Sequence, residues 1–209
     1  DAVDISDFNR KKKSNRIKKT CCYTGSLAKG KGLEKIFEIS KKLKNIDFHI
    51  YGDFLNSNYS VKDFNEYENV KYKGYLSYNK IPKVLEKYDV LLMPYAEKVY
   101  GRGSNLEIGK YMSPLKLFDY LAAGKIIIAT DLKVYDHILN KNNAILIKDS
   151  KVDEWVKKIN FVFKNLKKFD YLKKNSKITI KKYTWDIRVK KVINFINVWV
   201  KLWGEKLVF

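Results

Sequence analysis

Two charged side chains stand three residues apart in the stretch 113–131, SPLKLFDYLAAGKIIIATD, which is otherwise almost wholly apolar. Ser113 followed by Pro114 is typical of a helix start, because serine caps free N–H groups and proline suits the first turn. This helix end and the Lys116 ammonium would suit a diphosphate. The Asp119 carboxylate, one turn further on, would accept hydrogen bonds from the two hydroxyls of a ribose. The alternative is a surface ion pair between Lys116 and Asp119, worth roughly a few tenths of a kcal/mol.

A glycine-rich loop, GSLAKGKG at 25–32, offers a second anion-binding feature. Its glycines do not form a G-x-G-x-x-G fingerprint, and Gly32 replaces the Ser or Thr that holds Mg²⁺ in a P-loop. The loop therefore lacks the metal ligand that a phosphoryl-transfer ATPase needs. What remains is a turn at Gly25 into a helix with Lys31 near its N-terminus, which suits an anion. A glycine-mediated turn without any ligand is the alternative.

The remaining reactive residue types indicate structural roles. The sequence has no Ser/His/Asp arrangement and no metal-ligand spacing, so we expect no cofactor and no bound metal. Cys21 and Cys22 would point to opposite faces of a strand, as small buried hydrophobic residues. His49 and His137 are expected to be structural.

Strand and helix patterns alternate along the chain with short joints. This alternation predicts an α/β fold, a Rossmann-like doubly wound parallel sheet with helices on both faces and a helical C-terminus. The predicted strands are 19–25, 47–53, 69–75, 89–95, 125–131 and 143–149, and the predicted helices are 31–44, 81–88, the stretch after 113, 132–139 and most of the chain from about 152.

Ligands of such sheets bind beyond the carboxyl ends of the strands. The candidate loops are therefore 25–32, 52–60, 74–78, 95–113 and 131–133. Within them, GRGSNLEIGKYM (101–112) is rich in glycine and lacks clear periodicity, so it is expected to be a mobile segment beside the ligand. An ordinary surface loop is the alternative.

Composition and charge set wider limits on function. The chain has 209 residues, of which 45% are hydrophobic, so it is long enough for one good core or two small ones. With 43 Lys and Arg against 23 Asp and Glu, the net charge of +20 favours nucleic acid, anionic lipid or phosphorylated small molecules as partners. The RKKK run at Arg10 to Lys13 is expected to be a solvated linker. No membrane-spanning run or signal pattern is present, which favours a cytoplasmic location.

The last segment carries an apolar stripe at helical spacing. Such a stripe is more typical of a core than of a membrane anchor, although basic flanking residues keep contact with an anionic membrane surface as an alternative. We divide the chain into an entry segment at 1–18, a ligand-binding domain at 19–183 and an amphipathic helix at 184–209. The stripe consists of Trp185, Val189, Val192, Ile196, Trp199, Val200 and Trp203.

Several motifs together resemble the C-terminal domain of GT-B glycosyltransferases, particularly glycosyltransferase family 4. They are GSLAKGKGLEKIFEI, FHIYGD, NVKYKGYL, IPKVLEKYDVLLMPY, MSPLKLFDYLAAGKIIIATDL and YTWDIR, in the family's order over most of the chain. The resemblance implies a domain that binds a nucleoside-diphosphate sugar for retaining hexosyl transfer, in bacterial polysaccharide or glycolipid synthesis. It also implies that an acceptor-binding N-terminal domain is missing, so that this domain alone is inactive or weakly active, and that the final helix crosses to that domain.

The resemblance assigns residues to each part of the donor. The ribose would contact Asp119, and the base would lie near Gly74, Tyr75 and Leu76. The diphosphate would be held by Gly25, Ser26, Lys31, Ser113, Leu115 and Lys116.

Three positions depart from the family pattern. The family often has Arg where Ser26 stands, which removes one phosphate contact. Its two glutamates, eight residues apart, correspond to Tyr111 and Asp119, so the first acid is missing and the second is shorter. Glu107 is a candidate substitute for the missing acid that faces the sugar.

Two other classes of function remain as alternatives. One is a non-catalytic nucleotide-binding subunit that partners a separate acceptor-binding chain. The other is a basic nucleic-acid-binding module, which would bind with a steep salt dependence. The chain shows no recognised helix-turn-helix and no aromatic RNA-binding platform, which disfavours the second alternative.

Overall fold

The computed structural model describes residues 1–8, 17–55, 57–101, 104–148 and 151–204, with side chains up to residue 200. The RKKK run at Arg10 to Lys13 and the side chain of Trp203 lie outside these residues.

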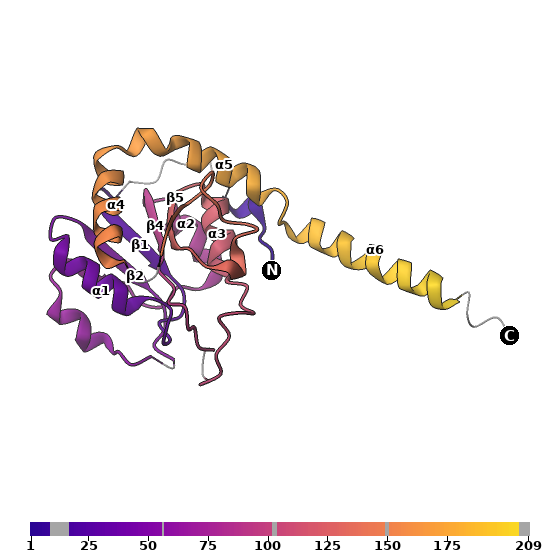
Figure 1. Cartoon of the computed structure of the whole chain (residues 1–209), viewed down its shortest axis with the longest axis horizontal. Coiled ribbons are helices and arrows are strands. Elements are labelled where there is room, and N and C mark those ends of the chain that lie inside the picture. Colours follow the sequence, from indigo (N-terminus) through magenta and orange to yellow (C-terminus); the bar gives the residue numbers. More distant parts are fainter. Residues whose placement is uncertain (9–16, 56, 102–103, 149–150, 205–209) are drawn as a thin grey trace.

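A single parallel sheet forms the centre of the molecule (Figure 1). Its six strands lie in the order β3-β2-β1-β4-β5-β6. The order reverses between β1 and β4, which places a topological switch point where their carboxyl ends meet. This confirms the predicted doubly wound α/β class. The strands are β1 (Thr20–Thr24), β2 (Asp47–Tyr51), β3 (Val70–Tyr72), β4 (Val90–Met93), β5 (Ile126–Thr130) and β6 (Ile145–Ile147).

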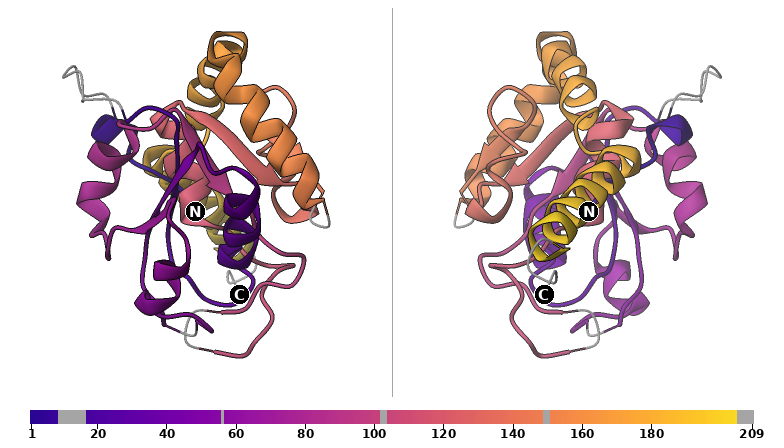
Figure 2. Two further views of the ribbon diagram at one scale, coloured as in Figure 1. Left: turned by 90° about the vertical axis from the view of Figure 1, so that its left-hand side faces the viewer. Right: turned by 90° about the vertical axis from the view of Figure 1, so that its right-hand side faces the viewer.

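Helices follow most of the strands and cover both faces of the sheet (Figure 2). The α-helices are α1 (Leu33–Lys42), α2 (Ile81–Leu85), α3 (Leu115–Ala123), α4 (Val152–Lys164), α5 (Asp170–Ile180) and α6 (Trp185–Gly204). Short 3₁₀ turns are η1 (Ile5–Phe8), η2 (Val61–Glu66), η3 (Tyr78–Lys80), η4 (Lys133–Tyr135) and η5 (Leu166–Phe169).

The two faces of the sheet bury separate hydrophobic cores. One core contains side chains of α1 and α4, and the other contains side chains of α2, α3 and the end of α5. Successive strand residues point to opposite faces, so Cys21 lies in the first core and Cys22 in the second. Both cysteines are free and fully buried, as predicted.

The predicted helix at 132–139 is wrong, because only the short turn η4 forms there. The apolar residues that suggested a helix, Tyr135, Ile138 and Leu139, are buried although no helix forms. The side chain of Asn143 stops the helical pattern, because its Nδ2 donates to the Ile138 carbonyl at 2.8 Å and its Oδ1 accepts from the Asn140 N–H at 2.9 Å.

The predicted cap of α3 is also wrong. The helix begins at Leu115, its N-cap residue is Pro114, and no side chain caps it. Ser113 therefore stands one position too early for its hydroxyl to cap the helix, and it is exposed. The first turn of α3 is left without a side-chain acceptor.

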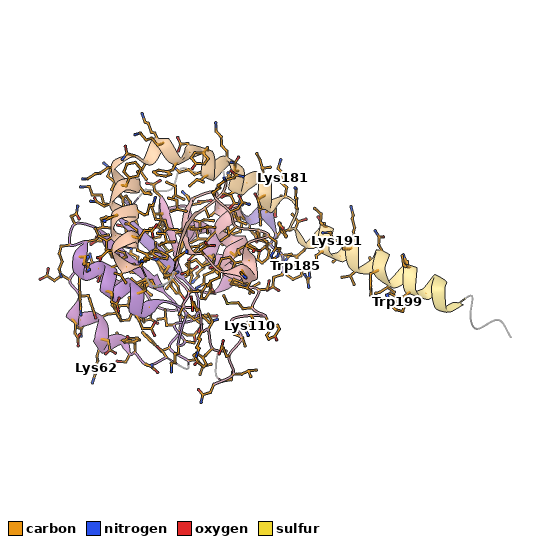
Figure 3. All side chains as sticks on the ribbon, viewed as in Figure 1. Lys62, Lys110, Lys181, Trp185, Lys191 and Trp199 are labelled. Carbon is orange, nitrogen blue, oxygen red and sulfur yellow. The ribbon has the colours of Figure 1, made fainter. Side chains whose placement is uncertain are left out.

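Helix α6 extends away from the rest of the domain (Figures 1 and 3). Its apolar side chains are about half exposed, including Trp185 and Trp199 at 47% each. The predicted stripe is thus uncovered over the described part of α6. None of the helices in the described ranges combines the length and apolarity needed to cross a membrane.

Candidate functional site

A buried lysine without a hydrogen-bond partner marks the site. Lys116, in the first turn of α3, is 8% exposed, and its Nζ has no hydrogen-bond partner in the part of the chain that the structure describes. The Nζ lies 3.7 Å from the centroid of the Tyr23 ring and 5.0 Å from that of the Tyr95 ring. Burial lowers the pKa of Lys116 well below its usual value, and the nearby Lys31 ammonium lowers it further. A buried ammonium held only by aromatic faces is a strong candidate for binding an anion.

Lys31 is the second cation of the site. Its Nζ lies 5.4 Å from the centroid of the Tyr95 ring, so Lys31 and Lys116 share this aromatic side chain. Burial also lowers the pKa of Lys31. Gly32, the N-cap of α1, has no side chain that could cap the helix. Two ammonium groups and a helix N-terminus without a side-chain cap can together bind a ligand with two or more negative charges.

Gly25 makes room for the Lys116 side chain. The residue has a φ of +126°, and a Cβ added there would lie 2.8 Å from Lys116 Cε and 2.9 Å from Lys116 Nζ. Its N–H donates to the Tyr51 carbonyl at 3.0 Å, which ties the loop after β1 to the end of β2. The backbone conformation therefore favours glycine here, and a larger residue would also displace the end of the Lys116 side chain.

Asp119 lies one turn further along α3 and is 3% exposed. Burial raises the pKa of Asp119 to about 7, and the hydrogen bond from Tyr78 opposes this rise. That bond is long, at 3.4 Å from the Tyr78 hydroxyl to Oδ1. The carboxyl group therefore keeps lone pairs that can accept further hydrogen bonds, and a vicinal diol would supply two donors. The alternative of a surface ion pair with Lys116 is wrong, because both side chains are buried.

A cavity of about 210 Å³ lies at the carboxyl ends of β1 and β2. Gly25, Ser26, Tyr75 and Leu76, all predicted from the sequence, line it together. Gly74 stands beside it, because its carbonyl accepts a 3.1 Å hydrogen bond from the Gly52 N–H. The structure thus brings the glycine loop and the segment after β3 to one place.

Ser26 is already engaged within the loop after β1. Its hydroxyl accepts a 3.3 Å hydrogen bond from the Ala28 N–H, and its carbonyl accepts a 2.8 Å bond from the Tyr23 hydroxyl. These bonds shape the loop that carries Lys31.

Other predicted residues do not join this cavity. Ser113 and Leu115 are exposed at the start of α3, and Ser113 lines a different cavity beside His137 and Arg188. Glu107 is exposed and pairs through an isolated backbone bridge with Tyr100. Tyr111, at the position of the family's first glutamate, is 87% exposed.

Sequence reasoning missed the aromatic part of the site. Tyr23 lies within β1 and Tyr95 directly follows β4, and both read in the sequence as ordinary core residues. No spacing therefore signals their contact with a lysine. Tyr78 lies in a turn without clear periodicity. Asp53 also lines the cavity, and the sequence did carry a signal for it. It is a polar residue directly after Gly52, at the end of a predicted strand and within the candidate loop 52–60.

The described residues contain no group of three or more His, Cys, Asp or Glu side chains that could hold a metal ion.

Comparison with known proteins identifies relatives of this arrangement. A family model described as "Glycosyl transferases group 1" matches residues 4–179, which is most of the chain. The chain is 31% identical over 80 residues to TuaH of Bacillus subtilis (strain 168), a protein assigned as a glycosyltransferase of teichuronic acid biosynthesis. That match covers 38% of this chain and 18% of TuaH.

Two solved structures share the fold. A mutant of S. aureus TarM in complex with fondaparinux, alpha-GlcNAc-glycerol and UDP matches with a TM-score of 0.69 at 20% identity, covering 91% of this chain and 38% of TarM. The C-terminal domain of the group 1 glycosyl transferase LpcC from Francisella tularensis matches with a TM-score of 0.65 at 16% identity, covering 88% of this chain and 99% of that domain. The chain therefore spans less than half the length of TarM and nearly all of the LpcC domain.

Proposed function

Because this chain belongs to the glycosyl transferases group 1 family, we propose that it binds the nucleoside diphosphate of a sugar donor at the carboxyl edge of its sheet. The observation that carries the proposal is the buried ammonium of Lys116, which lacks a hydrogen-bond partner and lies next to Lys31. A diphosphate would supply the missing negative charge.

Each part of the donor has a matching group in this proposal. Lys31 and Lys116 bind the diphosphate, and Asp119 accepts hydrogen bonds from the ribose hydroxyls. The base enters the cavity lined by Tyr75 and Leu76. UDP is the first nucleotide to test, because the TarM structure contains it.

The two lysines would also promote the transfer step. When the bond between the sugar carbon and the diphosphate oxygen breaks, negative charge grows on the leaving diphosphate. Two ammonium groups fixed beside aromatic rings would stabilise this charge without moving. We propose retention of the sugar's configuration, which the resemblance to glycosyltransferase family 4 supports.

We further propose that the acceptor-binding half lies outside these 209 residues. The chain matches less than half of TarM and nearly all of a C-terminal domain, which supports this division. The uncovered apolar stripe of α6 would pack against that half, and an anionic membrane surface is the alternative occupant. The product would be a bacterial polysaccharide, as the relation to TuaH suggests.

Titration calorimetry with UDP, uridine and 2′-deoxy-UDP tests the site assignment. Lys116→Ala should weaken UDP much more than uridine, because the lost charge-assisted contact is worth roughly 1.5 to 3 kcal/mol. Asp119→Asn should weaken UDP far more than 2′-deoxy-UDP, since the deoxy ligand already lacks part of the contact. Equal losses for all ligands would overturn the assignment, and a matched GDP series would identify a guanine donor.

A further inference from the structure

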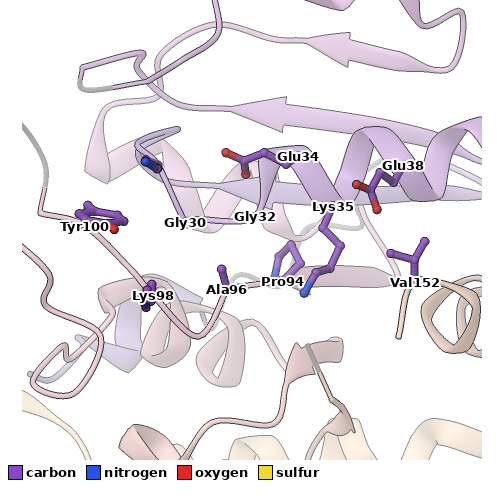
Figure 4. A pocket seen from close by; sticks show the side chains of 11 residues that line it. Gly30, Gly32, Glu34, Lys35, Glu38, Pro94, Ala96, Lys98, Tyr100 and Val152 are labelled. Atoms are coloured by element: carbon purple, nitrogen blue, oxygen red, sulfur yellow. The ribbon is translucent and has the colours of Figure 1, made fainter. Parts of the chain in front are cut away.

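A second and larger cavity lies along the first turns of α1. It has a volume of about 510 Å³, within the range of about 300 to 1,000 Å³ that is usual for small-molecule sites. One wall is α1 with Glu34, Lys35 and Glu38, and the other is the segment 94–100 that follows β4 (Figure 4). We call this cavity the α1 groove.

Two glycines fix the shape of the α1 groove. A Cβ on Gly30 would lie 2.1 Å from the Lys98 carbonyl oxygen, and one on Gly32 would lie 2.1 Å from the Pro94 carbonyl oxygen. The backbones are also joined by a 3.0 Å hydrogen bond from the Ala96 N–H to the Gly30 carbonyl. The wall opposite α1 is thus held by backbone contacts, so the groove is preformed.

The segment 94–100 separates the α1 groove from the diphosphate site. Its alternate residues Pro94, Ala96, Lys98 and Tyr100 line the groove. Tyr95, between them, is 2% exposed and lies against Lys31 and Lys116 instead. Val99 is likewise buried, so the side chains between the lining residues turn away from the groove. A ligand in the groove would therefore be a neighbour of the nucleotide and not the nucleotide itself.

The side chains of the α1 groove suit a neutral polyol. Lysines and glutamates occur together in it, so hydrogen-bond donors and acceptors are both present while much of the charge cancels. A phosphate site would need the cations without the carboxylates. Tyr100 adds an aromatic ring, with Lys29 Nζ 5.1 Å from its centroid, and Pro94, Ala96 and Val152 add apolar surface. A sugar ring combines hydroxyl groups with apolar C–H faces and matches this mixture.

We propose that the α1 groove binds uncharged sugar units of the acceptor glycan, so that this domain holds part of the acceptor beside the donor. This inference rests on the proposed donor site. The α1 groove is assigned to the acceptor because the segment 94–100 has the groove on one side and Lys31 and Lys116 on the other.

Saturation-transfer NMR on the 209-residue chain tests the groove with four probes. These are methyl α-D-glucopyranoside, N-acetyl-D-glucosamine, D-glucuronate and inorganic phosphate. We expect the two neutral sugars to bind, and Tyr100→Ala and Glu38→Ala each to weaken them by about tenfold. The UDP affinity of both variants should equal that of the wild type. Tyr171→Ala, a half-exposed tyrosine of α5, is the matched control and should leave sugar binding unchanged.

Three outcomes would overturn the groove assignment. They are UDP binding without any binding of neutral sugars, a preference for glucuronate or phosphate, and sugar binding that survives both groove variants. If the wild type binds sugars in the groove but does not bind UDP, the sugar site stands and the proposed donor function fails.

Discussion

At the scale of single residues, the site keeps two ionisable groups where the fold alone would place apolar ones. Lys116 and Asp119 are buried in α3. Burial lowers the pKa of Lys116 and raises the pKa of Asp119, and both shifts favour the uncharged form. Among the described residues, no opposite charge beside either group compensates its burial. Stabilising groups are not arranged in this way, whereas binding sites that await a charged ligand often are.

Replacing Lys116 with methionine should separate stability from binding. The thioether keeps much of the side-chain volume and removes an ammonium without a hydrogen-bond partner, so the free energy of unfolding should rise by about 1 to 3 kcal/mol. UDP affinity should fall by at least about tenfold. Urea unfolding and calorimetry measure the two effects. A variant that is less stable than the wild type would show that the contacts of Lys116 with the Tyr23 and Tyr95 rings outweigh the cost of burying its ammonium.

Asp119 should make the stability of the free protein depend on pH. Its folded pKa of about 7 lies above its ordinary value of 3.8. As pH rises between these values, the unfolded chain gives up this proton first, so Asp119 contributes less and less to stability. Asp119→Asn lacks this loss, and its advantage over the wild type should grow between about pH 4 and about pH 7. Urea titrations across this range check the trend, and a constant difference would contradict it.

At the scale of elements, short connections between strands and helices position the site. The alternation of strand and helix was predictable because each element carries its own apolar spacing. The contacts of Lys116 with Tyr23 and Tyr95 were not predictable, since the three residues come from α3, β1 and the segment after β4. A buried tyrosine that contacts a lysine looks in the sequence like any other core tyrosine. The failed helix at 132–139 has a similar cause, because the amide of Asn143 acts from outside the segment.

Three glycine-to-alanine variants should have distinct effects, although each glycine has a positive φ. Gly32→Ala should destabilise the protein most, because its Cβ would meet the Pro94 backbone at 2.1 Å. Gly74→Ala, with no atom within 4 Å of the new Cβ, should cost only the backbone strain of about 1 to 3 kcal/mol. Gly25→Ala should have a similar stability to Gly74→Ala but weaker UDP binding, since it displaces Lys116. Thermal unfolding and UDP titration compare the three, and equal UDP affinities would contradict the role of Gly25.

At the scale of the whole molecule, the chain combines the proposed donor-binding edge of the sheet with the uncovered helix α6. The positive charge is spread widely, as the labelled Lys62, Lys110, Lys181 and Lys191 illustrate (Figure 3). Such a field would attract an anionic nucleotide without fixing its position. The buried lysines would supply that position.

The isolated chain should show little or no glycosyl transfer. Positioning the acceptor against the donor carbon supplies a large share of the rate, and we place most of the acceptor site in another half. The rate at which the wild-type chain releases UDP from UDP-glucose in the presence of a glycan acceptor should equal the rate measured for the Lys116→Ala variant. Release far above this variant would show that the 209 residues contain a complete acceptor site.

The tryptophans of this chain are unevenly placed. Trp155 is fully buried in α4, whereas Trp185, Trp199 and Trp203 all belong to α6. Intrinsic fluorescence would therefore report mainly on the environment of α6. A blue shift in emission would signal that this helix has become covered, and it would do so even if the sheet domain had not changed.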